Sequence, residues 1–194
     1  MLKDLFVSEV RINILGLFLN NPDKQFHVRA VVRSVEAEIN AVRRELLKLN
    51  KIGLLRKRQS GNRIYYTADP SNIFYPDLLA LMAKEGILAK TLLKHTKEIG
   101  NVKFAVLSNA FLRGRKSTVL DVDLFIVGHN IDLDALKRII NAAEREMGKE
   151  LNYTVMNETD FVFRKRKNDH FVSKILIQSR CMLIGDEEEF CAFI

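Results

Sequence analysis

An amphipathic segment followed at once by a basic hairpin pattern constrains this fold more than any other feature. Between residues 38 and 49, apolar residues recur at steps of three, four and three positions, which is the spacing of one buried helix face. These apolar residues are Ile39, Val42, Leu46 and Leu49. Gly53 follows them and is expected to end the helix. The opposite face then points outward and carries amide, guanidinium and ammonium groups on Asn40, Arg43, Arg44 and Lys48.

Two short β-prone runs follow this helix, over residues 54–59 and 63–68, on either side of the sequence Ser60-Gly61-Asn62. Gly and Asn at such a turn indicate a β-hairpin. Its cationic and amide side chains belong to Arg56, Lys57, Arg58, Asn62 and Arg63. Upstream, we expect a first helix with Ser8 as its N-cap, a short strand over residues 25–27 and a second helix over residues 28–35.

The order of helix and hairpin resembles a winged helix-turn-helix of the ArsR-like transcriptional regulators. The resemblance is carried by Leu46, Leu49, Gly53, Leu54, Leu55 and the return strand Arg63-Ile64-Tyr65-Tyr66. It implies double-stranded DNA as the partner and a homodimer as the common assembly. The chemistry agrees, because cations attract phosphates without regard to sequence, while Asn and Arg hydrogen-bond base edges in the major groove. The alternative is a solvated basic face on an ordinary three-helix bundle.

Charge is distributed unevenly along the 194 residues, whose formal net charge is +7. Residues 1–69 contain thirteen Lys and Arg against seven Asp and Glu, whereas residues 121–160 contain four against nine. The basic balance of the whole chain permits a polyanionic partner. The contrast between the two regions favours two modules with different tasks.

We therefore expect an α+β chain in three parts. Residues 1–72 form the winged helix-turn-helix domain, and residues 73–100 form a helical connector that breaks near Gly86 and is a possible dimerisation segment. Residues 101–194 form an α/β domain with a small mixed sheet. Its strands are expected over residues 102–107, 122–127, 151–156 and 180–184. Its helices are expected over residues 132–147, with Leu133 on the buried face, and over residues 158–178, each begun by a capping Asp132 or Asn157.

The two cysteines, Cys181 and Cys191, stand ten residues apart with no His at ligand spacing. We expect reduced thiols in a cytoplasmic protein rather than a disulfide framework or a zinc site. No signal peptide is expected, and the longest apolar run, around residues 14–19, is too short to cross a bilayer.

A pair of carboxylates, Asp121 and Asp123, precedes an apolar run in the second half. Side chains two apart on a strand point to the same face, so the two carboxylates are expected to emerge together from the sheet. Such a pair can hold Mg²⁺, which in turn orients a nucleoside triphosphate. The alternative is two surface acids at the start of a strand.

The residues around this pair resemble the signature of the minimal nucleotidyltransferases. The resemblance is carried by the run from Asn109 and Ala110 to Arg113-Gly114, then six residues, then Asp121-Val122-Asp123-Leu124. It implies a small mixed sheet with helices, a Gly-Ser pair that holds the triphosphate, and three carboxylates that bind metal ions. Asn109 and Ala110 stand where that Gly-Ser pair is expected, and Asn152 stands where the third carboxylate is expected.

These departures predict a degenerate module. Ala offers no hydroxyl to a phosphate, and Asn is neutral and cannot act as a base. Loss of such contacts costs orders of magnitude in rate, because each ~1.4 kcal/mol of transition-state stabilisation is a factor of ten. We expect a transcriptional regulator with a nucleotidyltransferase-like module for dimerisation or for ligand or partner sensing. The alternatives are an active Mg²⁺-dependent nucleotidyltransferase of the toxin–antitoxin type, targeted by its winged domain, and a protein-interaction scaffold.

Overall fold

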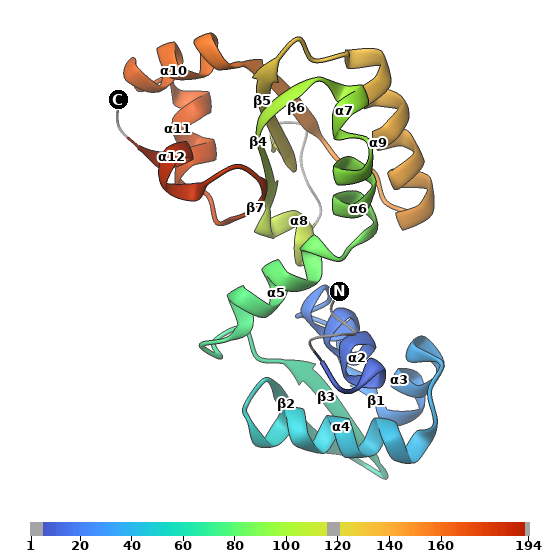
Figure 1. Ribbon diagram of the computed structural model, residues 1–194. Helices are drawn as coiled ribbons and strands as arrows, with labels where there is room; N and C mark the ends of the chain where they lie inside the picture. Colours follow the sequence, from blue (N-terminus) through green and yellow to red (C-terminus); the bar gives the residue numbers. More distant parts are fainter. Residues whose placement is uncertain (1–5, 116–120, 193–194) are drawn as a thin grey trace. The chain divides into compact units, whose positions relative to one another are not determined.

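The computed structural model describes residues 6–115 and 121–192, which divide into two compact units, Met1–Glu85 and Gly86–Ile194 (Figure 1). Each unit contains helices and one small sheet. The chain therefore belongs to the α+β class that its sequence predicts. Within the described residues, no helix is both long enough and apolar enough to cross a membrane.

The described part of the first unit contains the helices α2 (Glu9–Leu19), α3 (Val28–Val35), α4 (Ile39–Lys51) and α5 (Tyr75–Lys84). The predicted cap of the first helix is confirmed, since the Ser8 hydroxyl accepts a hydrogen bond from the Arg11 amide at 3.2 Å. The periodicity of α4 is also confirmed, because Val42, Leu46 and Leu49 are buried in the core of the unit.

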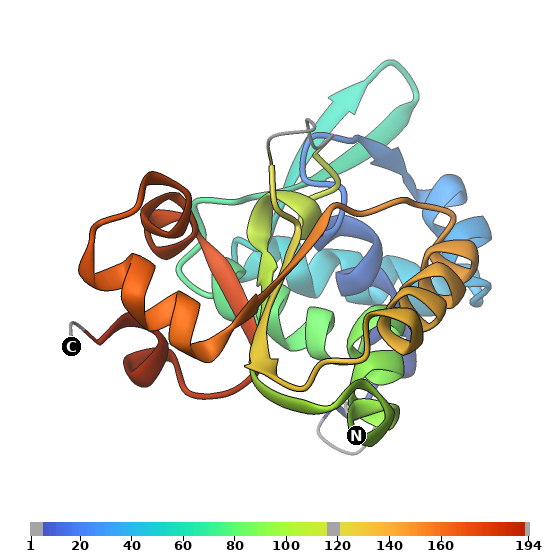
Figure 2. The same cartoon turned by 90° about the horizontal axis from the view of Figure 1, so that it is seen from above.

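The sheet of the first unit has the order β1-β3-β2, with antiparallel pairs throughout. Its strands are β1 (Phe26–His27), β2 (Leu55–Ser60) and β3 (Arg63–Ala68). Ser60 pairs with Arg63, which leaves Gly61 and Asn62 as the two-residue turn, and Gly61 has the positive φ of 53° that such a turn requires. The β2–β3 hairpin extends beyond the helices of its unit (Figure 2).

The predicted connector over residues 73–100 is not a separate part of the fold. Tyr75 of α5 is fully buried in the first unit, and its hydroxyl donates to the Leu19 carbonyl at 2.9 Å. The next helices, α6 (Ile87–Lys94) and α7 (Thr96–Ile99), belong to the core of the second unit. The boundary therefore lies inside the segment, between Glu85 and Gly86, because the apolar faces of its two halves are buried in different cores.

The second unit is a four-stranded mixed sheet with helices on both faces (Figure 1). Its strands are β4 (Asn101–Ser108), β5 (Leu124–His129), β6 (Tyr153–Asn157) and β7 (Arg180–Ile184), in the order β6-β5-β4-β7. Only the pair of β5 with β6 is parallel among these strands. The remaining helices are α8 (Asn109–Leu112), α9 (Leu133–Met147), α10 (Glu158–Arg166), α11 (His170–Ile177) and α12 (Glu187–Cys191).

Alternate residues of the strands face two separate cores. Leu107 and Ile126 pack with α6 and α9 on one face, and Phe104 and Phe125 pack with α10, α11 and α12 on the other. Covered on both faces, the central strands β4 and β5 are apolar almost throughout, as their sequences predict.

Two local predictions for this unit are wrong. The single helix expected over residues 158–178 is two helices, because Asn168 adopts a left-handed conformation with φ 51° and Asp169 caps the second helix. Leu133 is 60% exposed rather than buried, because it is the first helical residue after the Asp132 cap and lies ahead of the buried stripe.

The division between the units predicts that each unfolds on its own. Fragments 1–85 and 86–194 are each expected to show a cooperative transition in urea, followed by circular dichroism, because each buries a core of its own. Fragment 1–72 is the control. It lacks the buried ring of Tyr75 and should be less stable than fragment 1–85 by at least about 3 kcal/mol. Equal stability of 1–72 and 1–85 would contradict the placement of α5 in the first unit.

Candidate nucleic-acid interface

Helix α4 presents a polar, cationic face to solvent. The predicted outward residues are all exposed, namely Asn40, Arg43, Arg44 and Lys48. Neither Arg43 nor Arg44 forms an ion pair with any residue that the structure describes. Lys48 differs, because its ammonium lies 3.2 Å from the Glu45 carboxylate. Among the described residues, the cations of α4 without an ion pair are therefore Arg43 and Arg44 in its first half and Lys51 in its last turn.

A buried carboxylate on the opposite face attaches α4 to α2. Glu45 accepts a hydrogen bond from the Arg11 guanidinium at 2.6 Å, and its side chain is only 9% exposed. Burial by itself raises the pKa of this carboxyl, but the hydrogen bonds from Arg11 and Lys48 outweigh it and hold the pKa below its ordinary value. This pair is not predictable from the sequence, since a Glu next to an apolar stripe has no periodic signal of its own.

The hairpin carries further exposed cations, but they are not equivalent. The predicted residues Lys57, Arg58, Asn62 and Arg63 are exposed, and the three cations among them form no ion pair within the described ranges. Arg56 is different, because its guanidinium donates to both oxygens of Asp69, at 2.8 and 2.7 Å. Arg56 thus ties the base of the hairpin to the end of the unit, whereas its contact with DNA stays a prediction.

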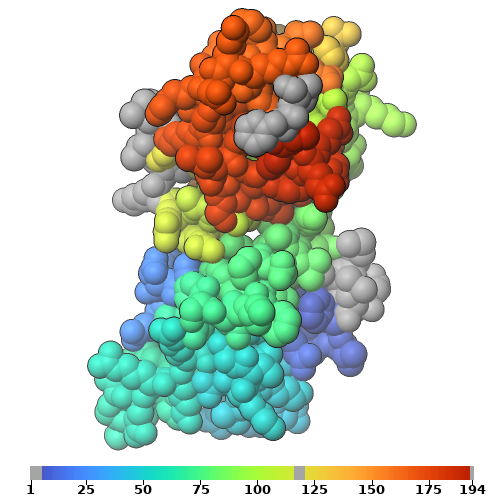
Figure 3. Space-filling view, turned by 90° about the vertical axis from the view of Figure 1, so that its left-hand side faces the viewer, coloured from blue at the N-terminus to red at the C-terminus, as the bar shows by residue number. Residues whose placement is uncertain are grey.

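The hairpin turn and the start of α4 enclose a concave surface of about 390 Å³. Its lining residues are His27, Val28, Arg29, Ile39, Arg43, Asn62, Arg63 and Ile64. Three arginines from three different elements therefore line one surface. Arg29 of α3 was not among the predicted residues, because its place beside the hairpin turn depends on the tertiary fold. In the space-filling view, the hairpin and α4 form one continuous part of the surface of this unit (Figure 3).

The second unit does not present its carboxylate pair as expected. Asp121 is half-buried and lines a shallow pocket with Asn152. Asp123 is only 2% exposed, and it accepts a hydrogen bond from the Asn152 backbone amide at 2.8 Å. The two acids therefore do not emerge together. The reason is that Asp123 is turned into the sheet, where it joins the start of β5 to the segment before β6.

Each of the two carboxylates has a lysine near it. The Lys174 ammonium lies 3.3 Å from Asp121, and Lys149, whose ammonium donates to the Phe111 carbonyl at 2.8 Å, lies close enough to Asp123 to interact electrostatically. Burial lowers the pKa of Lys149, while Asp123 raises it in part. Within the described residues, no three His, Cys, Asp or Glu side chains gather as metal ligands. These residues do not fit a Mg²⁺ centre.

The residues that resemble a phosphate-binding motif have structural contacts. The Asn109 amide donates to the Ser179 hydroxyl at 2.7 Å, which ties α8 to the turn before β7, and Ser108 caps α8. Ala110 and Gly114 are exposed, and Arg113 is half-buried. The described atoms include no partner for the buried Asn109 side-chain oxygen.

No protein-family model matches this chain, and comparisons with curated proteins and with solved structures find no significant match either. The homodimer, the nucleotide ligand and the cytoplasmic location stay predictions.

The ion pair at the base of the hairpin predicts an acid-shifted carboxyl. Hydrogen bonds from Arg56 and Ser71 lower the pKa of Asp69 to about 2. A lowered pKa in the folded state stabilises the protein above the ordinary carboxyl pKa, and this stabilisation is lost as the pH falls through about 2. In a titration of the Asp69 carboxyl carbon by NMR, the midpoint should lie near pH 2 and should rise toward 3.8 in Arg56→Gln. Arg58→Gln is the control and should leave the midpoint in place.

Proposed function

We propose that the first unit is a winged helix-turn-helix domain that binds double-stranded DNA, and that the protein regulates transcription. Helix α4 would enter the major groove, while the β2–β3 hairpin would lie along the neighbouring phosphate backbone. The observation that carries the proposal is the convergence of Arg29, Arg43 and Arg63 on one concave surface between the helix and the hairpin turn. Like charges gather in this way where a polyanion compensates their repulsion.

The distribution of free and paired cations supports this orientation. Near the start of α4, Arg43 and Arg44 form no ion pair with the residues that the structure describes, and both lie within four positions of Asn40. Such side chains pair with guanine and adenine edges when a helix lies in the major groove. On the hairpin, Lys57, Arg58 and Arg63 stay available for phosphates, which carry no sequence information. The two elements thus suit two different tasks on one duplex.

We further propose that the protein acts as a homodimer, and that the second unit is a nucleotidyltransferase-like module without catalysis. Two contacts support the second part. The Lys174 ammonium lies 3.3 Å from one oxygen of Asp121, and Asp123 is buried against the Asn152 amide, so the two carboxylates do not face one open site together. A module of this kind is suited to dimerisation or to sensing a ligand or partner.

Under this proposal, Arg43 contacts base edges and Arg58 contacts phosphates, so their substitution should affect DNA binding differently. Arg43→Ala should weaken binding to a selected operator by about tenfold or more, corresponding to ~1–3 kcal/mol, and should affect random duplex much less. Arg58→Ala should weaken both duplexes alike and reduce the slope of log K against log salt concentration by about 0.9. Fluorescence anisotropy at several salt concentrations measures both effects.

Arg56→Ala is the matched control for Arg58→Ala, because both residues lie on β2 and Arg56 is occupied by Asp69. Its salt slope should stay close to that of the unchanged protein. If Arg43→Ala, Arg56→Ala and Arg58→Ala all kept the DNA affinity and the salt slope of the unchanged protein, the DNA-binding proposal would be contradicted.

The second prediction concerns catalysis. The purified protein, incubated with Mg²⁺ and labelled nucleoside triphosphates, should transfer no label to DNA, RNA or protein acceptors. The reason is that Asp121 and Asp123 are held by Lys174 and by the backbone of Asn152. Transfer that Asp121→Ala abolishes would establish the active nucleotidyltransferase instead. Lys137→Ala, an exposed change on α9, controls for general effects of substitution in this unit.

A further inference from the structure

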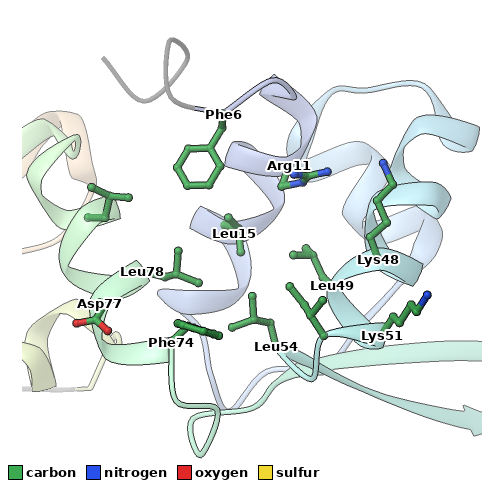
Figure 4. Close-up of a pocket in the computed structure, with 12 residues that line it drawn as sticks. Phe6, Arg11, Leu15, Lys48, Leu49, Lys51, Leu54, Phe74, Asp77 and Leu78 are labelled. Atoms are coloured by element: carbon green, nitrogen blue, oxygen red, sulfur yellow. The ribbon is translucent and has the colours of Figure 1, made fainter.

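The first unit contains a second hollow, on the side of α4 that the proposed DNA site does not use. This groove has a volume of about 750 Å³ and lies between α2, the end of α4 and α5, entirely within residues 6–81 (Figure 4). Its walls are apolar side chains, among them Phe6, Leu15, Leu49, Leu54, Phe74 and Leu78. Phe74 and Ile52 at its edge are 61% and 59% exposed. Large apolar side chains left open to water around one concavity mark a binding surface.

The charges around this groove are separated. Arg11, Lys48 and Lys51 lie on the side formed by α2 and α4, and Asp77 lies on the opposite side (Figure 4). Glu45 pairs with Arg11 and Lys48 and cancels one of the three positive charges. Lys51 forms no ion pair with the residues that the structure describes. One rim of an otherwise apolar cavity therefore has a positive surplus, and the Lys51 side chain extends outward from that rim (Figure 4).

We propose that this groove binds an amphipathic anion: a single carboxylate-like head at the Lys51 side and an aliphatic or aromatic body along the apolar walls. Small-molecule sites have volumes of roughly 300–1,000 Å³, apolar walls and a few polar groups that fix orientation. The groove meets each of these conditions. Charge complementarity selects an anion over a neutral or cationic ligand of the same shape.

Under the proposed function, the position of the groove would allow such a ligand to act as an effector. Leu49 and Lys48 belong to α4, and Leu54 immediately precedes β2, so the ligand would contact both elements assigned to DNA under the proposed function. Binding itself does not depend on that function, because every lining residue is present in the protein without DNA.

Isothermal titration of the full chain with dodecanoate, below its micelle concentration and without DNA, tests the proposal. We expect saturable binding with one molecule per groove. Affinity should rise by about fourfold for each methylene from octanoate to dodecanoate, as more chain enters the apolar walls. Dodecyltrimethylammonium, which has the same chain and a positive head, should bind at least tenfold more weakly.

Variants locate the ligand. Lys51→Glu should weaken dodecanoate binding at least tenfold, whereas Lys24→Glu, an equal charge reversal outside the groove, should leave it unchanged. Leu78→Trp fills the groove and should abolish binding without a loss of helicity in circular dichroism. Binding that survives both groove variants, or that is as tight for the cationic amphiphile, would overturn the proposal.

A second copy of the chain is the competing occupant. Light scattering that shows a dimer dissociated by Phe74→Asp, together with no dodecanoate binding, would assign the groove to that copy and overturn the proposal. Because these measurements contain no DNA, their failure is distinguishable from a failure of the DNA-binding proposal, which the operator titrations test.

Discussion

One buried carboxylate fixes the helix on which both proposed sites depend. Glu45 lies among Val42, Leu46 and Leu49 on the inward side of α4, and Arg11 of α2 compensates its charge at 2.6 Å. A buried charge without a partner costs several kcal/mol, so α4 keeps this pair only in the rotation that brings Glu45 to Arg11. Apolar side chains tolerate small rotations of a helix, whereas an ion pair does not. The pair therefore sets which residues of α4 face outward.

Ion pairing also determines which cations of the first unit are available to a phosphate. Arg56 and Arg58 are two residues apart on β2 and have the same side chain, yet Arg56 is held by Asp69 and Arg58 has no ion pair among the described residues. In the composition of the chain, Arg56 and Arg58 each contribute one positive charge. Only the fold separates a guanidinium that braces the hairpin from one that can neutralise a phosphate.

Sequence periodicity predicted the first unit well because its elements are local. The apolar steps of α4, the Gly61-Asn62 turn and the Ser8 cap each depend on residues a few positions apart, and all three are confirmed. Contacts between distant residues were not predictable in this way. Arg11 with Glu45 and Lys174 with Asp121 join positions far apart, and no pattern in the chain announces them.

The predictions for the connector over residues 73–100 and for the carboxylate pair were both wrong. Residues 73–100 have one continuous helical character, and nothing local indicates that α5 and α6 are buried in different cores. Asp121 and Asp123 have strand spacing, but the residue that turns inward is selected by the Asn152 amide across the sheet. For residues 73–100 the local pattern was correct and the tertiary partners determined its meaning. For the carboxylate pair the pattern itself was wrong, because both acids precede β5 (Leu124–His129) and the alternation of a strand does not apply to them.

The placement of the two candidate sites on one helix has a thermodynamic consequence. The concave surface with Arg43 and the groove with Lys48 and Leu49 use different sides of α4, so a molecule in one need not touch a molecule in the other. Coupling then has to pass through the position of α4 between α2 and the hairpin. An amphipathic anion alters DNA affinity only by the free energy with which it prefers one position of α4 over another. Reciprocity requires DNA to alter the affinity for the anion by the same factor. The Arg11–Glu45 pair, which resists rotation of α4 and borders the groove, is the contact through which this free energy would act.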